Sequence, residues 1–461
     1  MDFIKTFQEA IKIPTWWPSG AQKGDAAAEA NLLRFQAFLT ERFPAFHKTA
    51  ERWVLSPYAV VYRLAGRGSE KARHGSANAP DTASTSDAVL LLAHYDVVPA
   101  ETEKWSVSPF GAEIKGSESG NFIYGRGTLD MKATLVSIME AAESLCSQGW
   151  KPAHDIWIAF GGDEERAGVL GAMETVRWFE KQGQRFAWVL DEGTPIAENQ
   201  IKGVDTPLAL VSIEEKGFLS LTLSVKQEPG HASRPPKVQA AAVLGQALCR
   251  IAKKPFPFRL SRTIEMFFRQ VSQYMPGIQG FVMRHARSLG GLFFKLAANN
   301  PAIESMVRTT VAMTQLEGSA ADNVMPSEVK AVINLRMLCP WTVETAKGFI
   351  EKAINDKRVT VSVYEMATDP IAASTAYEQY GWPSIQAAMN QAWPGIPLLP
   401  FLMVATTDSR HYQKIASAIF RFSPFKLTPE ELGTIHGHDE RISEENLRRG
   451  LSFYTSLLRS L

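Results

Sequence analysis

The sequence predicts an α/β protein with a mostly parallel central sheet and an inserted α+β domain of the ferredoxin-like plan. Short aliphatic runs such as residues 90–93, bounded by polar residues, are typical of strands buried on both faces. From residue 88 onward such runs alternate with helical segments, whereas residues 216–226 alternate apolar and polar side chains, as in a half-exposed antiparallel strand. A chain of 461 residues exceeds one ordinary core, so we expect two domains.

The first part of the chain supplies the central sheet. Residues 3–43 show mostly helical periodicity, and residues 53–64 are apolar enough for strands. Residues 66–87 lack periodicity and are predicted to form a long exposed loop before the first core strand. A loop at 125–130 then leads into a helix and places Asp130 at or near its N-cap. The strands that follow the exposed loop are at 88–93, 156–160 and 187–190, and the helix is at 132–148.

The middle of the chain predicts the second domain. After the alternating strand, the order of elements is helix, strand, strand, helix, strand, at 239–252, 308–313, 329–338, 343–354 and 359–365. Together with the alternating strand this is the ferredoxin-like order. We therefore predict that residues 214–366 are inserted between residues 1–213 and residues 367–461, which together form the other domain.

Residues 256–301 exceed what the ferredoxin-like plan needs and are rich in phenylalanine and methionine. One interpretation is an extra helical pair that packs on the small domain. The others are an apolar cover for a hydrophobic substrate, or a surface that contacts a membrane or a second subunit. The sequence leaves all of these open.

Composition and charge exclude several classes of protein. Hydrophobic residues make up 45% and charged residues 21%, as in a soluble globular enzyme. With 49 basic and 48 acidic residues the net charge is +1, so no bulk field attracts nucleic acid or an anionic membrane. Three scattered cysteines indicate thiols in a reducing compartment rather than a disulfide framework. No signal peptide is visible and no apolar run approaches the ~18 residues of a membrane span, so we expect a cytoplasmic protein without a span.

Polar residues gather where the predicted strands end, which is the edge where α/β sheets bind ligands. His94 and Asp96 follow the first core strand and point the same way, so Asp96 can orient His94. The sequence 163–165 and the pair 191–192 place carboxylates after the next two strands, and Asp130 adds another at a helix start.

These side chains form a plausible set of metal ligands, because zinc accepts both imidazole nitrogen and carboxylate oxygen. The candidate ligands are His94, Asp130, Glu165, Asp191 and either His436 or His438. Five ligands suit two ions about 3.5 to 4 Å apart that share a carboxylate and hold a hydroxide. Adjacent side chains cannot easily bind one ion, so one of Glu164 and Glu165 is free to act as general base. Singly, each residue has a simpler explanation, such as a helix cap for Asp130 or favourable first-turn charges for the glutamates.

Five motifs resemble those of the dinuclear zinc exopeptidase and amidohydrolase family, which includes aminoacylases, carboxypeptidase S, glutamate carboxypeptidases and succinyl-diaminopimelate desuccinylase. The motifs are HYDVVP at 94–99, GRGTLDMK at 125–132, GDEE at 162–165, LDEG at 190–193 and HGHDER at 436–441. They occur in family order across nearly the whole chain. The resemblance implies a zinc-exopeptidase catalytic domain with an inserted lid.

The resemblance also implies roles for single residues of the catalytic domain. Its metal ligands would be His94, Asp130, Glu165, Asp191 and His436, with Asp130 bridging two Zn²⁺ ions. Asp96 would orient His94, and Glu164 would be the catalytic base. Zinc is preferred, although Co²⁺ or Mn²⁺ also suits such a site.

In the lid, the sequence GHAS at 230–233 matches a family motif whose histidine polarises the scissile carbonyl, sometimes from the other subunit of a dimer. His231 would take this role. Asn323 and Arg336 match lid positions that meet the substrate carboxylate, and the planar fork of Arg336 suits a bidentate contact. Residues 407–411 resemble a substrate-side loop of the carboxypeptidase S-like branch, and the long insertion at 256–301 points to the same branch.

These observations predict a two-metal hydrolase that cleaves an amide or peptide bond next to a free carboxylate, as a dipeptidase or carboxypeptidase does. A metal-bridging hydroxide would attack, with Glu164 as general base. The alternative substrate is an N-acyl amino acid with an apolar acyl group, cleaved as by an aminoacylase. A non-catalytic binding protein on the same fold would require a missing base or ligand. We expect a small-molecule substrate, no nucleic-acid partner, and a monomer or a homodimer formed through the lid.

Overall fold

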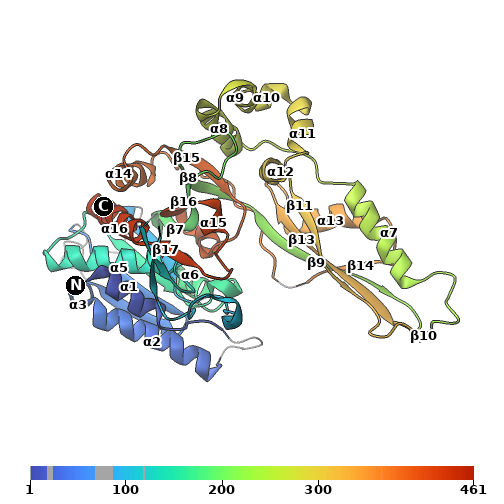
Figure 1. Cartoon of the computed structure of the whole chain (residues 1–461), viewed down its shortest axis with the longest axis horizontal. Helices are drawn as coiled ribbons and strands as arrows, with labels where there is room; N and C mark the ends of the chain where they lie inside the picture. The colour runs from blue at the N-terminus through green and yellow to red at the C-terminus, as the bar shows by residue number, and fades with distance from the viewer. Residues whose placement is uncertain (1, 18–23, 68–86, 118–119, 365) are drawn as a thin grey trace.

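A computed structural model describes residues 2–17, 24–67, 87–117, 120–364 and 366–461. Figure 1 shows a broad body built around a sheet, an elongated lid extending from one side of it, and a group of short helices above the junction. Both chain ends lie in the body (Figure 1). The predicted architecture is thus confirmed. The expected loop at 66–87 lies almost entirely outside the described residues.

The body contains a mixed sheet of eight strands in which the central neighbours β6, β3, β7 and β16 run parallel. At one edge β1 and β2 add in antiparallel fashion, and at the other β15 pairs parallel with β8. In spatial order the strands are β1 (Glu51–Ser56), β2 (Ala59–Leu64), β6 (Ile156–Gly161), β3 (Val89–His94), β7 (Phe186–Ala197), β16 (Ala416–Leu427), β8 (Leu208–Glu215) and β15 (Leu398–Met403).

Helices cover both faces of this sheet, so the strands have two cores. Leu91 and Ala93 of β3 pack in one core, whereas Leu90 and Leu92 pack in the other. This explains why the run at 90–93 is apolar without alternation. The first core is covered by α1 (Phe3–Ile11), α2 (Ala26–Arg42), α3 (Pro44–Thr49), α5 (Lys132–Ser147), α14 (Trp382–Ala392) and α16 (Glu444–Arg459). The second is covered by α6 (Ala172–Lys181) and the 3₁₀ turn η5 (Asp408–Lys414).

A second, three-stranded sheet connects two distant parts of the chain. It consists of β4 (Ile114–Ser117), β5 (Gly120–Tyr124) and β17 (Arg441–Ser443). Arg441 pairs with Tyr124 in register. The loop that precedes β17 therefore lies beside the loop that follows β5, although more than three hundred residues separate them.

The lid has the predicted ferredoxin-like order. Its antiparallel sheet follows the spatial order β11 (Thr310–Glu317), β13 (Glu328–Met337), β9 (Gly217–Lys226) and β14 (Thr360–Val363). Helices α7 (Ala240–Lys253) and α13 (Val343–Ile354) share a core with this sheet. Beyond the sheet, the short strands β10 (Gly230–His231) and β12 (Val324–Met325) pair at the far end of the lid (Figure 1).

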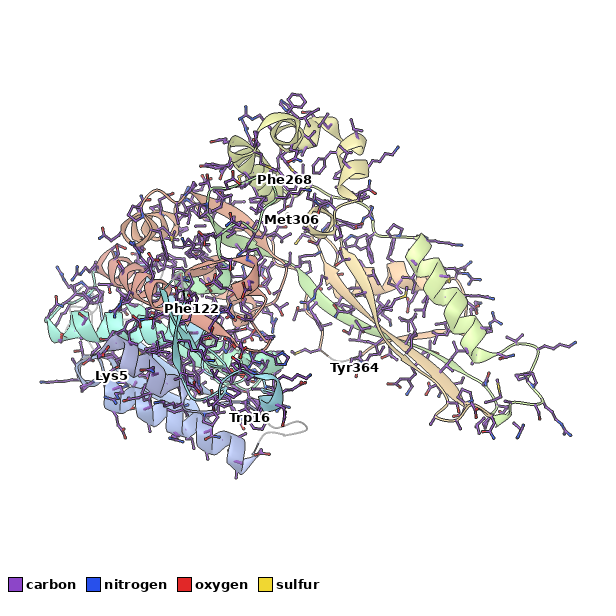
Figure 2. All side chains as sticks on the ribbon, in the orientation of Figure 1. Lys5, Trp16, Phe122, Phe268, Met306 and Tyr364 are labelled. Carbon is purple, nitrogen blue, oxygen red and sulfur yellow. The ribbon has the colours of Figure 1, made fainter. Side chains whose placement is uncertain are left out.

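The apolar insertion forms several short helices that pack on the edge of the central sheet. The ring centroids of Phe267 and Phe401, a residue of β15, are 4.8 Å apart, and Leu399 and Leu402 join the same core. Phe268 and Met306, labelled in Figure 2, also belong to it. The helices are α8 (Arg262–Val271), α9 (Gly277–Arg284), α10 (Ala286–Leu289), α11 (Gly291–Ala297) and α12 (Pro301–Val307), with the 3₁₀ turn η4 (Ser272–Tyr274).

This packing differs from the interpretation of an extra helical pair on the small domain. The aromatic side chains of the insertion meet β15, so the insertion belongs structurally to the body as much as to the lid. No helix in the described parts of the chain is both long and apolar enough to cross a bilayer.

Candidate metal centre

His94 ends β3 and lies buried at the edge where the parallel strands finish. Its Nε2 atom is 2.9 Å from Oδ1 of Asp130 and 3.5 Å from Oε1 of Glu192. Ligand atoms of these three residues lie within 4.8 Å of one another, as a common cation requires. One imidazole and two carboxylates therefore form the first group of possible ligands.

A second group lies on the other oxygen of Asp130. The Nε2 atom of His436 is 3.0 Å from Oδ2 of Asp130 and 3.1 Å from Oε1 of Glu165. The three side chains again bring ligand atoms within 4.8 Å of one another. Asp130 thus lies between the two groups, in the position that the sequence analysis gave to a bridging carboxylate.

Asp191, expected from the sequence as a ligand, is in neither group, and Glu192 takes that place. The two oxygens of Asp191 accept hydrogen bonds from the backbone N–H groups of Ser409, at 2.8 Å, and Glu192, at 2.9 Å. The side chain of the next residue, Glu192, faces His94 instead. Neighbouring residues of a strand point in opposite directions, so only one of the two can face His94. The pairing of β7 with β16 becomes irregular directly after Asp191, and Glu192 is the residue that faces His94.

Asp130 is also not the helix cap that its position suggested. The N-cap of α5 is Met131, and no side chain caps this helix start. Instead, the carboxylate of Glu440 holds the loop before the helix. Its oxygens accept hydrogen bonds from the N–H groups of Gly127, Leu129 and Asp130, at 2.8 to 3.2 Å. The carboxylate of Asp130 is therefore left to face the two histidines.

Glu440 itself is fixed by Arg126, whose Nη1 atom donates a hydrogen bond of 2.7 Å to it. Both side chains are buried. Arg126 also donates to the carbonyl of Gly437, next to His436, at 2.8 Å. One ion pair thus positions both the Asp130 loop and the His436 loop.

Asp96 lies where the sequence predicted, next to His94. The Nδ1 atom of His94 is 2.9 Å from the backbone carbonyl of Asp96 and 3.3 Å from its Oδ1 atom. The same carboxylate accepts hydrogen bonds of 3.1 Å from the backbone N–H groups of Glu164 and Glu165. Asp96 therefore orients His94 and also fixes the turn that carries the two glutamates, η3 (Glu164–Arg166).

The nearby carboxylates raise the pKa values of both histidines. Burial alone would lower the pKa of His94, but the charge of Glu192 and hydrogen bonds to Asp130 and Asp96 raise this pKa well above its usual value. Hydrogen bonds to Asp130 and Glu165 raise the pKa of His436 to about 10. His436 therefore holds a proton at neutral pH when no other cation neutralises the carboxylates, and the carboxylates favour the protonated form of His94 in the same way.

The pKa values of Glu192 and Glu164 are raised as well. Burial, followed by the charge of Asp130, raises the pKa of Glu192 to about 8. Burial and the charge of Glu192 raise the pKa of Glu164 well above its usual value. So many carboxyl groups in one buried place repel one another, and positive charge relieves that repulsion.

The donor set fits two divalent cations. Each group offers one imidazole nitrogen and carboxylate oxygens, the mixture that zinc accepts, and the groups share Asp130 as dinuclear sites do. Asp96 supplies the carboxylate behind the histidine that such sites commonly have. We therefore assign the residues that could hold metal as His94, Asp130, Glu165, Glu192 and His436.

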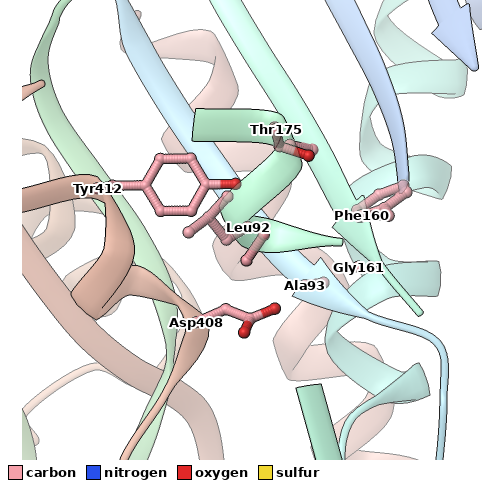
Figure 3. A pocket seen from close by; sticks show the side chains of 9 residues that line it. Leu92, Ala93, Phe160, Gly161, Thr175, Asp408 and Tyr412 are labelled. Carbon is pink, nitrogen blue, oxygen red and sulfur yellow. The ribbon is translucent and has the colours of Figure 1, made fainter. Parts of the chain in front are cut away.

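Behind the strand ends, a cavity of about 10 Å³ lies against Asp408 and Tyr412 of η5 (Figure 3). Asp408 fits there because Gly161 has no side chain; a Cβ atom at Gly161 would lie 2.9 Å from Oδ2 of Asp408. Burial, followed by the charge of Asp163, raises the pKa of Asp408 well above its usual value. The 407–411 loop thus forms the wall behind the metal centre.

Arg336 extends from the lid toward the body. It lies on β13 with its guanidinium 4.8 Å from the ring centre of Phe218. Burial, followed by the charge of Arg410, lowers its pKa, while Glu215 acts in the opposite direction. Arg410 donates a hydrogen bond of 3.4 Å to the carbonyl of Ala167, just after the η3 turn. The structure therefore brings a lid cation near the part of the body that carries the metal centre.

His231 and Asn323 are not brought to the centre within one chain. His231 is in β10, and Asn323 accepts a hydrogen bond of 3.0 Å from the N–H of Ala232 through its backbone carbonyl. Both are exposed, and this end of the lid lies far from the body (Figure 1). Within the chain, therefore, neither residue can reach a substrate at the metal centre.

Two residues of this centre carry roles that the sequence analysis did not give them. Glu192 and Glu440 both occur in the quoted motifs, but nothing local distinguishes Glu192 from Asp191 or shows what Glu440 holds. Strand alternation does not supply that signal either, because β3 and β7 pair in parallel with Leu90 opposite Val189. An unbroken count from this register places Asp191, not Glu192, on the face of His94.

A sequence model of Peptidase family M20/M25/M40 matches residues 90–460. The chain belongs to this family. It is 31% identical to the N-fatty-acyl-amino acid synthase/hydrolase PM20D1 of Xenopus tropicalis, over 99% of this chain and 85% of that protein. It is also 31% identical to the probable carboxypeptidase S-like 2 of Dictyostelium discoideum, over 94% of this chain and 80% of that protein.

Solved structures of other proteins show the same fold. The M20 family metallo-carboxypeptidase Sso-CP2 from Sulfolobus solfataricus matches with a TM-score of 0.70 and 14% identity, over 100% of this chain and 99% of that one. Human carnosine dipeptidase 1 matches with a TM-score of 0.66 and 14% identity, over 99% and 95%. The resemblance predicted from the motifs is confirmed, and the chain is a metal-dependent M20 hydrolase rather than a non-catalytic binding protein.

Proposed function

We propose that this M20 enzyme hydrolyses N-acyl amino acids with apolar acyl groups, using two metal ions. The observation that carries the two-metal part is Asp130, whose two oxygens face His94 and His436 separately. The substrate class is supported by similarity over almost the whole chain to a protein named as an N-fatty-acyl-amino acid synthase/hydrolase. This choice reverses the order of the two substrate classes expected from the sequence.

The metal ions would be held by His94, Asp130 and Glu192 on one side and by Asp130, Glu165 and His436 on the other. Two such cations supply positive charge that polarises the amide carbonyl and makes water more acidic. Zinc is the preferred ion, with Co²⁺ and Mn²⁺ as alternatives.

Glu164 is the proposed general base. Asp96 fixes its backbone N–H at 3.1 Å, so its side chain is held beside the ligand group rather than on a mobile loop. A carboxylate oxygen of Glu164 takes a proton from the attacking water and later passes it to the nitrogen of the leaving amine.

Arg336 is the proposed partner of the substrate carboxylate. It is a lid residue that lies close enough to the body for the charges of Arg410 and Glu215 to shift its pKa. Glu215 is already paired with the buried Arg421, so Arg336 and Arg410 leave positive charge for an anionic group. A guanidinium binds a carboxylate through two parallel hydrogen bonds. Both N-acyl amino acids and peptides carry a free carboxylate, so this contact serves either substrate class.

The distant position of His231 and Asn323 supports a homodimer formed through the lid, in which one lid reaches the partner's metal centre. The edge strand β11 offers a surface for such contact, because Met313 and Leu316 are exposed on it. An unpaired edge with exposed apolar side chains is a common place for association. In this arrangement His231 of one chain polarises the carbonyl in the active site of the other.

The substrate proposal is tested with the zinc-loaded protein on N-acyl amino acids of rising chain length and on dipeptides. We expect kcat/KM to rise with acyl length and to exceed that for dipeptides. A preference for dipeptides or for peptide C-termini would instead support the dipeptidase or carboxypeptidase function. That second candidate is favoured by the similarity to a probable carboxypeptidase S-like protein.

A further inference from the structure

The helical insertion exposes apolar side chains at its outer end. Ile278 and Phe281 of α9 are 79% and 56% exposed, and Leu292 and Leu296 of α11 are 57% and 50% exposed. Within each helix the spacing is three or four residues, so each pair shares one helix face. We call these four residues the α9–α11 patch. Figure 1 shows α9, α10 and α11 at the outer end of the insertion, above both the body and the lid.

This exposure is unusual for the chain. Among the phenylalanines in the described ranges, Phe281 alone is classed as exposed. The patch is not a disordered surface, because the opposite faces of the same helices are packed. Phe293 and Ala297 of α11 are buried in the core shared with β15, and Phe294 stacks on Phe258 with ring centres 5.0 Å apart. The exposed side chains are therefore presented by a fixed scaffold.

The helices that carry the patch have charged side chains of one sign only. From residue 266 to residue 303 the sequence contains no aspartate or glutamate, but it contains Arg269, Arg284, Arg287 and Lys295. The whole chain has a net charge of only +1, so this segment is a local concentration of positive charge. Arg287 pairs with Glu265 at 2.6 Å, whereas Arg284 and Lys295 are exposed on α9 and α11 themselves.

An anionic lipid surface binds apolar side chains that have cations beside them. The apolar groups enter the headgroup region, and the cations contact the lipid charges. We propose that the α9–α11 patch docks this enzyme on the surface of an anionic bilayer, without a membrane span. A second copy of the chain fits less well, because a two-fold contact through the patch would bring Arg284 and Lys295 of both copies together.

The test uses the 461-residue, zinc-loaded protein and vesicle flotation. One set of vesicles is phosphatidylcholine alone, and the other is a three-to-one mixture of phosphatidylcholine and phosphatidylserine. We expect binding to the mixed vesicles, weaker binding to phosphatidylcholine, and release by added salt. A double variant, Phe281→Ser with Leu296→Ser, should reduce binding at least about tenfold because both apolar anchors are lost.

A second double variant, Arg284→Glu with Lys295→Glu, should reduce binding to the mixed vesicles at least about tenfold and abolish the preference for phosphatidylserine. The matched control is Leu33→Ser with Val54→Ser, which removes apolar side chains of similar exposure, 46% and 48%, from the body. It should bind as the wild type does. An unchanged melting temperature shows that each variant is folded.

Two results would overturn the proposal. One is a wild-type protein that binds neither kind of vesicle. In that case sedimentation velocity is measured on the double variant Phe281→Ser with Leu296→Ser, to see whether it converts a dimer to a monomer. If it does, the patch is a contact between copies. The other is a folded serine variant that floats with mixed vesicles as well as the wild type.

Discussion

Asp191 and Glu192 are neighbours on β7 with different surroundings. The Asp191 carboxylate accepts a backbone hydrogen bond from Ser409, whereas the Glu192 side chain faces His94. We expect Glu192→Gln to bind one zinc ion fewer than the wild type, because an amide is a poor replacement for a carboxylate ligand. Its kcat/KM should fall at least about a hundredfold. Metal analysis after dialysis, with a hydrolysis assay on the same samples, checks both effects.

Asp191→Asn is the matched comparison. It should keep both zinc ions but melt at a lower temperature, because an amide cannot accept from both Ser409 N–H and Glu192 N–H as the carboxylate does. If Asp191→Asn lost metal while Glu192→Gln kept it, the assignment of Glu192 would be wrong.

Glu164 and Glu165 are also neighbours, and only Glu165 lies within reach of His436. We expect Glu164→Gln to keep both metal ions and to lose about 10²- to 10⁴-fold in kcat, the usual effect of removing a general base. Glu165→Gln should lose metal as well as activity. Metal content and kcat measured side by side separate these roles. An active Glu164→Gln variant would remove Glu164 from the mechanism.

The pKa of His436, raised to about 10 by Asp130 and Glu165, makes metal binding depend on pH. At pH 6 to 8 the imidazole of the metal-free protein is protonated, and this proton must leave before the nitrogen binds metal. Zinc affinity should therefore rise with pH, by about tenfold per unit for each proton displaced. Calorimetric titration in two buffers of different ionisation enthalpy measures the proton release. No dependence on the buffer would contradict it.

At the scale of elements, the loop between β5 and α5 is placed by a residue from near the other end of the chain. Glu440 accepts from three backbone N–H groups of this loop and from Arg126. We expect Glu440→Gln to weaken zinc binding about 10- to 100-fold, because it leaves Arg126 buried without its countercharge and loosens the loop that carries Asp130. Competition with a zinc chelator measures this affinity.

The matched control for that variant is Glu430→Gln. Glu430 also pairs with an arginine of this region, Arg441, but its side chain is 82% exposed. Exposed ion pairs contribute little to the stability of the folded structure, so the zinc affinity of this variant should equal that of the wild type. Equal losses in the two variants would mean that Glu440 does not act by holding the loop.

At the scale of the whole molecule, the lid carries His231 away from the metal centre of its own chain (Figure 1). If active sites are completed across a dimer, inactive Glu164→Gln and His231→Ala chains should complement each other when they are mixed and reassembled. One site of each hybrid dimer would be intact, so equal mixing should restore about a quarter of wild-type activity. Activity before and after reassembly provides the measurement.

The control mixture combines Glu164→Gln with Glu192→Gln. Both changes lie in the body, so each hybrid dimer has a defect in both sites and no activity should return. Hybrid dimers that form without restored activity in the His231→Ala mixture would show that His231 does not act across subunits.

The sequence by itself determined the elements and most of the chemistry. Apolar runs without alternation predicted strands buried on two faces, and the order of elements after residue 214 predicted the ferredoxin-like lid. His94, Asp130, Glu165 and His436 were identified as candidate ligands and do come together. Such patterns are readable because the period of a strand or helix and the chemistry of a side chain are local properties.

Only the tertiary structure decided which neighbours meet. In the folded chain Glu192 rather than Asp191 faces His94, and Glu440 binds the loop that carries Asp130. The aromatic insertion packs on β15, and His231 lies far from the metal centre. Each of these depends on how a strand is rotated in its sheet or on contacts between segments far apart in the sequence. Local periodicity does not contain that information, because it is set when the sheets, helices and lid pack together.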